Sequence, residues 1–204
     1  MLTLLIRSEP LMATTYSHSA SLKRSVVTSI AVIFLATERL VFRTHELKDE
    51  NDFIQMHTDP EVRRYVGGQP WPLEKAAHRF RTQYLGKPAK AYGLWATVLK
   101  EEGKYIGCCG LRFAKEGVRL GFYLSRPYWR RGLASEASRA FIDLGFRRLR
   151  LRRIWADVEK GNVASEHILE KLGFKCVSQQ EVPAAKRIIC LYELRKTQWE
   201  KYLP

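Results

Sequence analysis

Cysteine is scarce in this sequence and shows no metal-binding spacing. The chain has 204 residues and four cysteines, Cys108, Cys109, Cys176 and Cys190. Without a C-x-x-C pair or an accompanying histidine pattern, they indicate neither a zinc site nor a disulfide framework. We therefore predict no metal, cysteines that serve as small packing residues, and a reducing, cytoplasmic compartment. A nucleophilic cysteine in a two-step reaction stays open as the alternative.

Long apolar runs and the common nucleotide-binding motifs are also lacking. The apolar run SVVTSIAVIFLA, residues 25–36, is too short to span a bilayer. It follows Lys23 and Arg24 as in a signal peptide, but it lacks a clear A-x-A cleavage site. Neither G-x-x-x-x-G-K-[ST] nor G-x-G-x-x-G marks a phosphate loop. The sequence therefore predicts neither a membrane protein nor a Walker-type or dinucleotide-binding enzyme.

Acidic residues are too few to balance the basic ones. Lysine and arginine total 35 against 21 aspartates and glutamates, which gives a net charge of +14. Between residues 126 and 153, nine arginines stand against only Glu136 and Asp143. Such a density favours an anionic partner, whether a phosphate-bearing cofactor, a nucleic acid or an acidic peptide. A solvated basic face without a partner is the alternative.

The composition divides the chain into two parts. Residues 1–36 are rich in serine, threonine and leucine and carry few charges, and we interpret them as an N-terminal extension of unknown role. It either packs on the domain as an extra strand or helix, or results from an early start codon, with Met12 as a second start; an export signal stays open as the alternative. Residues 37–204 are long enough for one domain with its own core.

Apolar periodicity predicts the order of strands and helices in this domain. We expect strands over residues 38–43, 92–100, 104–114, 118–125 and 153–158, and two more near 174–178 and 187–194. Helices are expected around Phe53 to Tyr65, over 73–85, over 135–148 and over 162–172. In the last of these, Ala164, Ile168 and Leu172 are predicted to face inward.

The segment YWRRGLASEA, residues 128–137, joins a strand to a helix through a tight turn. The unpaired amides of a first helical turn and the helix dipole both favour an anion there. Gly132 allows close approach of the backbone, and Ser135 either caps the helix or donates to a phosphate oxygen. The turn therefore predicts an anion site, with a bare tight turn as the alternative.

This segment resembles the acetyl-coenzyme A pyrophosphate loop of the GNAT superfamily, written [QR]-x-x-G-x-[GA]. Trp129 replaces the Gln or Arg, as is usual in the RimJ/RimL-type branch. The motifs TERLVFR, TDPEVRRYVGG, GFYL, NVASEHILEKLGF and CLYELRKTQWE also match in order, so the resemblance covers residues 37–199. It implies an α/β (α+β) fold, in which a mixed, mostly antiparallel sheet is flanked by helices in a single domain.

The resemblance also implies the site residues. Backbone amides of GFYL near Tyr123 and Leu124, with Phe122 beside them, would bind the pantetheine arm and the thioester carbonyl. The pyrophosphate would be held by the amides of Arg130, Arg131, Gly132, Leu133, Ala134 and Ser135. Asn162 would bind near the pantetheine arm, although it is also a good helix N-cap. Ser165 and Tyr123 are the catalytic candidates, with Tyr192 as a further proton donor.

Two positions depart from the family pattern. Where many GNAT enzymes place a tyrosine as general acid, four residues before the glycine of the G-F motif, this chain has Leu169. Where the branch often has a glutamate, this chain has Arg119, so the proton acceptor is unassigned. An α-amine, with a pKa of about 8, needs less help to lose its proton than a lysine amine at about 10.4. This favours α-amines or weakly basic small amines as acceptors.

We therefore expect an acetyl-CoA-dependent N-acetyltransferase in which a primary amine attacks the thioester directly. The acceptor is the N-terminal α-amine of a peptide or protein, or a small-molecule amine, and the enzyme is a monomer or a homodimer. Two alternatives stay open: a noncatalytic CoA-binding module, and a ribosome- or RNA-associated protein. The basic segment lacks the interleaved aromatic residues of a single-strand platform, which argues against nucleic acid.

Overall fold

The computed structural model describes residues 31–88, 91–183 and 186–202. The strands are β1 (Ile33–Ala36), β2 (Leu40–Arg43), β3 (Trp95–Leu99), β4 (Lys104–Ala114), β5 (Gly117–Leu124), β6 (Arg153–Glu159), β7 (Lys175–Val182) and β8 (Arg187–Arg195). The helices are α1 (Glu50–Thr58), α2 (Pro60–Arg63), α3 (Leu73–Arg79), α4 (Leu133–Asp143), α5 (Val163–Lys171) and α6 (Lys196–Trp199). None of these helices is long and apolar enough to cross a membrane.

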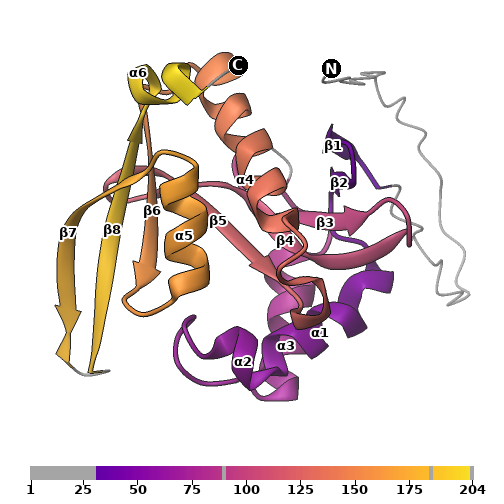
Figure 1. Ribbon diagram of the computed structural model, residues 1–204. Coiled ribbons are helices and arrows are strands. Elements are labelled where there is room, and N and C mark those ends of the chain that lie inside the picture. The colour runs from indigo at the N-terminus through magenta and orange to yellow at the C-terminus, as the bar shows by residue number, and fades with distance from the viewer. Residues whose placement is uncertain (1–30, 89–90, 184–185, 203–204) are drawn as a thin grey trace, which may run out of the picture.

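The strands form one sheet in the order β1-β2-β3-β4-β5-β6-β8-β7. Strands β5 and β6 run parallel, and the other neighbouring strands in the described chain are antiparallel. In Figure 1, β7 and β8 stand at one end of the sheet and β1 and β2 at the other, with α4 and α5 in front. The predicted fold, a mixed and mostly antiparallel sheet flanked by helices, is confirmed.

Alternating strand side chains divide the core between the two faces of the sheet. The larger cluster lies on the side of α4 and α5, where Phe141 and Leu169 are fully buried. The smaller cluster lies under α1 and the turn after α3, and consists of Phe53, Phe80, Ala96 and Tyr105. The sheet is therefore packed on both faces, and its central strands are fixed from both sides.

The N-terminal limit of the domain lies before the predicted residue 37. Strand β1 pairs with β2, Leu35 is buried, and the ring of Phe34 stacks on Trp95 at a centroid distance of 4.1 Å. The end of the apolar run is thus an edge strand, because its side chains complete the core beside β2. Residues 1–30 of the predicted extension, with Met12, lie outside the described residues.

Some local predictions were wrong. Ala164 is exposed, since the first turn of α5 lies beside an open cavity, and Leu169 with Leu172 makes the buried contact instead. Cys176 is exposed on the edge strand β7, whereas the other three cysteines are buried as predicted. The helix predicted to begin at residue 135 begins at Leu133 and continues beyond Asp143 as a π-helical turn.

Two histidines are buried between α1 and the sheet. His57 is 3% exposed, stacks on Trp71 at 4.4 Å, and has no hydrogen-bond partner for either ring nitrogen in the described chain. Burial, together with the charges of Arg63 and Arg79, lowers the pKa of His57 to about 3. Burial also lowers the pKa of His45 to about 4, although a hydrogen bond with the Leu94 carbonyl acts against this.

Acid should therefore destabilise the fold. As the pH falls below about 6.5, His45 and His57 take up protons in the unfolded chain but stay neutral where they are buried in the folded protein. The free energy of unfolding therefore falls. We expect His57→Phe, which keeps a flat ring against Trp71, to remove roughly 1–2 kcal/mol of the loss between pH 7 and pH 5. Urea unfolding at the two pH values measures this. His78→Gln, at an exposed histidine, is the control, and an unchanged loss in His57→Phe would contradict the assignment.

Candidate active site

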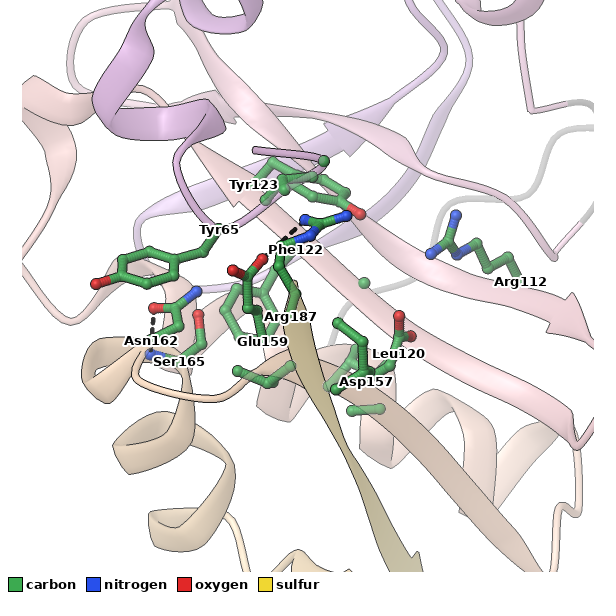
Figure 2. A pocket seen from close by; sticks show the side chains of 16 residues that line it. Tyr65, Arg112, Leu120, Phe122, Tyr123, Asp157, Glu159, Asn162, Ser165 and Arg187 are labelled. Atoms are coloured by element: carbon green, nitrogen blue, oxygen red, sulfur yellow. Dashed lines mark hydrogen bonds and ion pairs between the residues drawn. The ribbon is translucent and has the colours of Figure 1, made fainter. Parts of the chain in front are cut away.

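The sheet opens between β5 and β6. Strand β5 pairs with β4 along its whole length, but it pairs with β6 only at Arg119 and Trp155. A cavity of about 300 Å³ occupies the divergence. It is lined by Tyr65, Val66, Gly67, Arg112, Leu120, Gly121, Phe122, Tyr123, Ala156, Asp157, Val158, Glu159, Asn162, Ser165, Arg187 and Ile189. Figure 2 shows their side chains gathered around this opening.

The antiparallel register decides which amides of β5 face the opening. The Ser125 amide donates to the Ile106 carbonyl at 2.9 Å, so it points toward β4. Amides alternate in direction along a strand, and therefore the Tyr123 amide also points to β4, whereas those of Phe122 and Leu124 point away from it. The sequence predicted Tyr123 and Leu124 as the free donors; the register replaces Tyr123 with Phe122.

The loop after β5 presents a row of unpaired amides at the start of α4. No backbone N–H of residues 130–135 donates to a protein acceptor within the described chain. Gly132 is the N-cap with a φ of 74°, and Arg130 has a φ of 59°, so both are left-handed. Ser135 lies in the first turn and does not cap the helix. Because α4 runs for eleven residues, its dipole adds to these donors, and the loop is a site for an anion.

Arg39, which the sequence did not single out, contacts this loop from the turn between β1 and β2. Its Nε donates to Glu136 Oε2 at 2.6 Å and its Nη1 donates to the Arg131 carbonyl at 2.9 Å. Burial acts to raise the pKa of Glu136, but hydrogen bonds from Thr37 and Arg39 outweigh it and lower the pKa. A charged pair thus ties the first turn of α4 to the turn between β1 and β2. The only sequence signal for Arg39 was its position within the motif TERLVFR.

Trp129 closes the loop against β5. Its indole Nε1 donates to the Leu124 carbonyl at 2.7 Å. That carbonyl faces away from β4, on the side of the opening, so the indole satisfies a group that β6 leaves unpaired. The tryptophan is therefore a structural part of the opening.

The start of α5 contributes two polar side chains to the cavity. Asn162 is the N-cap, and its Oδ1 accepts from the Ser165 amide at 3.3 Å, as the dashed line in Figure 2 marks. The side-chain NH₂ of Asn162 is left for the cavity, so capping and ligand binding are compatible. Leu169 is completely buried, so this position holds core packing where many relatives are expected to hold a tyrosine.

Tyr123 points from β5 toward the α1 side of the sheet. Its ring lies 6.5 Å from the ring of His57, and burial raises the pKa of Tyr123, so the hydroxyl stays protonated at neutral pH. Tyr192 is buried in the core and does not line the cavity. Tyr123 and Ser165 are therefore the hydroxyl donors among the predicted residues that the structure brings to the opening.

Two carboxylates that the sequence did not predict line the cavity from β6. Asp157 lies 2.9 Å from Arg119, and Glu159 lies 2.8 Å from Arg187. Alternation in RIWADVE could have revealed them, because Ile154, Ala156 and Val158 are the buried set and leave Asp157 and Glu159 on the opposite face. They are the two carboxylates among the residues that line the cavity.

The comparisons with known proteins agree with this geometry. Residues 39–175 match the family model described as "Acetyltransferase (GNAT) domain". The "Uncharacterized N-acetyltransferase p20" of Bacillus licheniformis is 34% identical over 146 residues, which cover 69% of this chain and 82% of that protein. The "Uncharacterized protein YkkB" of Bacillus subtilis is 31% identical over 68% of this chain and 83% of its own length.

Solved structures show the same fold. The acetyltransferase (GNAT family) from Bacillus anthracis has a TM-score of 0.69 at 21% identity, and the match covers 79% of this chain and 98% of that one. A GCN5-related N-acetyltransferase from Brucella melitensis has a TM-score of 0.66 at 16% identity, over 81% of this chain and 79% of that one. Taken with the family model and the sequence relatives, the opened sheet and the free loop amides are those of an acyltransferase, and the chain belongs to the GNAT acetyltransferase family.

Proposed function

We propose that this enzyme, of the RimJ/RimL type, moves the acetyl group of acetyl-CoA to a primary amine. The observation that carries the proposal is the run of unpaired amides at residues 130–135, beside a sheet that opens between β5 and β6. Such amides fit a diphosphate, and the left-handed Gly132 leaves room for its close approach. The residues present therefore fit coenzyme A.

The binding roles follow the geometry of the opening. The amides of residues 130–135 would hold the diphosphate, and the Asn162 side chain would bind the pantetheine arm. When bound, acetyl-CoA supplies an acyl group on a thiol leaving group. The amides of Phe122 and Leu124 would donate to its carbonyl oxygen, where negative charge grows during attack. Placing these donors in a fixed strand removes the cost of orienting them during the reaction.

Proton transfer needs an acceptor for the amine and a donor for the departing thiolate. Asp157 and Glu159 are the acceptor candidates, because both line the cavity from β6. Ser165 and Tyr123 are the donor candidates, and the raised pKa of Tyr123 keeps its proton available. A thiolate is a fair leaving group, with a reference pKa of about 8.5, so one hydroxyl donor suffices.

Direct attack is favoured over an acetyl-cysteine intermediate. Burial raises the pKa of Cys108 to about 12 and raises that of Cys109 as well, so neither thiol ionises near neutral pH. Cys176 is exposed on β7, and neither it nor Cys190 lines the cavity. No cysteine is among the residues that line the described cavity, so in this proposal the amine itself attacks the thioester.

The acceptor is proposed to be a peptide or protein α-amine or a small-molecule amine. Free thiols suit the cytoplasm, which we propose as the compartment. The assembly is proposed to be a monomer or a homodimer, with the ribosome as an alternative partner for the basic segment. Coenzyme A should raise the melting temperature, and thiol release with a panel of amines should follow acetyl transfer.

Gly132→Val should weaken coenzyme A binding. A β-branched residue at a φ of 74° costs about 1–3 kcal/mol, and the loop would relieve that strain by moving its amides. We expect the dissociation constant, measured by calorimetry, to rise about tenfold or more. Gly86→Val is the matched control, because Gly86 has a φ of 69° with open space around it outside the loop. Equal affinity in Gly132→Val and the parent would refute the loop assignment.

Ser165→Ala and Tyr123→Phe should slow turnover more than they weaken cofactor binding. Loss of the proton donor leaves the thiolate without assistance, which is worth about 10²-fold in kcat or more. Steady-state kinetics with saturating acetyl-CoA measures kcat, and Ser178→Ala on the exposed strand β7 is the control. If both variants keep the parent rate, neither hydroxyl acts as the proton donor.

Asp157→Asn and Glu159→Gln test the proton acceptor in the same way. The variant that lacks the acceptor should lose about 10²-fold in kcat, and the acid limb of its pH–rate profile should disappear. Coenzyme A affinity should stay close to that of the parent, because the proposed diphosphate contacts are made by the amides of residues 130–135 and not by these carboxylates. Glu170→Gln, at an exposed carboxylate of α5, is the control. If both variants keep the parent rate and profile, water takes the proton without either carboxylate.

A further inference from the structure

Arg63 is a buried cation without a carboxylate partner. It is 7% exposed at the end of α2, and its Nε donates to the Gln69 carbonyl at 3.4 Å. Within the described chain, no aspartate or glutamate lies within ion-pair distance of its guanidinium. A buried charge without a counterion is costly, so such a residue calls for a partner that binds.

The guanidinium borders the wall of the cavity. Its Nη2 lies 2.7 Å from where a Cβ on Gly67 would stand, and Gly67, with a φ of 85°, lines the cavity. The next glycine, Gly68, stands in the same relation to Arg187 Nη1, at 3.9 Å. Arg187 lines the cavity too, as Figure 2 shows. Two guanidiniums thus meet at one bare turn, residues 67–68.

An aromatic side chain fixes the orientation of Arg63. The guanidinium lies 4.4 Å from the centre of the Trp71 ring, and Arg79 lies 4.7 Å from the same ring. Trp71 is itself stacked on His57. Burial lowers the pKa of Arg63; Tyr123 acts against this, whereas Arg79 and Arg187 lower the pKa further. The cations are therefore close enough to repel one another, which an anion would relieve.

Most other charged side chains around the cavity are paired, whereas Arg112 lines it as an exposed arginine without an ion pair in the described chain. Arg187 binds Glu159, and Arg119 binds Asp157 together with Glu116. Arg63 and Arg79 make no ion pair in the described chain, so they are the excess positive charge near the turn at residues 67–68. Of the β6 carboxylates, Glu159 is held beside the turn by Arg187, whereas Asp157 is held by Arg119. Asp157 and Arg63 thus suit a ligand with an amine and an anion.

We propose that the acceptor amine also carries an anionic oxygen group, a carboxylate or a phosphate, which Arg63 binds beside the turn at residues 67–68. This inference rests on the proposed function, because the anion positions an amine for the acetyl transfer inferred above. Guanidinium groups match both oxygen groups through paired hydrogen bonds. Polyamines and other purely cationic amines would lack the group that Arg63 binds.

The test measures product binding, so that differences in amine basicity do not interfere. N-acetylglycine, N-acetyl-β-alanine and N-acetyl-4-aminobutyrate offer the carboxylate at three distances, and their amides are the uncharged counterparts. N-acetyl-2-aminoethyl phosphate and N-acetylethanolamine form the phosphate pair. Calorimetry with the full chain, with and without coenzyme A, gives each affinity. In at least one pair, we expect the anion to bind about tenfold tighter.

Substitutions assign the binding to Arg63. Arg63→Met should abolish the preference for the anion and leave the affinity for the uncharged partner within about twofold. Arg63→Lys, which keeps the charge, should retain part of the preference and guards against a folding defect. Arg64→Met is the matched control, because Arg64 is the exposed neighbour and lies near Glu61. It should bind like the parent.

The outcomes separate this inference from the proposed function. Coenzyme A binding together with equal affinity for acid and amide, or with no binding of any anion, overturns the inference alone. A preference that survives in Arg63→Met overturns the assignment to Arg63. A preference that Arg63→Met abolishes, in a protein that binds no coenzyme A, supports the anion site and refutes the proposed function.

Discussion

The separation of β5 from β6 is the constraint on which the site depends. A parallel pair that stayed in register would use the amides of Phe122 and Leu124 for its own hydrogen bonds and would leave no cavity. Because only Arg119 and Trp155 remain paired, those amides face open space, and the Trp129 indole satisfies the Leu124 carbonyl. A polar backbone without partners is costly in a closed core, so the opening suits a molecule that brings its own acceptors. The packed faces on either side keep the opening from collapsing.

Several arginines of the basic segment, residues 126–153, have partners within the protein. Their side chains contact an aromatic ring or a carboxylate: Arg139 lies over Trp199, Arg147 lies near Asp143, and Arg153 lies near Glu193. Positive charge at the loop is carried by the exposed Arg130 and by Arg131, whose Nη1 lies 3.7 Å from Glu102 Oε1. Binding of a diphosphate by amides and a helix dipole needs little formal charge in addition. The unpaired amides of residues 130–135 therefore indicate the ligand more directly than the high net charge of the chain does.

The sequence could predict the elements and the anion loop because both are local. Period-two and helical patterns located the strands and helices, and Gly132 with its neighbours marked the turn before α4. Asp157, Glu159 and Arg39 were not predicted, since their roles arise from strand order and from a contact across the sheet, which no local pattern encodes. The Tyr123 amide was assigned wrongly for a similar reason: its direction depends on the register with β4. Leu169 is the opposite case. This single residue predicted that the tyrosine hydroxyl is missing, and the structure explains it, because the side chain packs in the core.

Strand β7 forms the outer edge of the sheet, and its residues are exposed along nearly the whole strand. It carries Cys176, while the other three thiols lie inside the protein. A maleimide dye would consequently attach at a single place under native conditions, without any prior cysteine removal. Cys176 pairs with Tyr192 on β8, the strand that begins at Arg187 in the cavity wall, so that dye would sit on the hairpin that borders the cavity. The chain thus provides its own position for a fluorescent label on this hairpin.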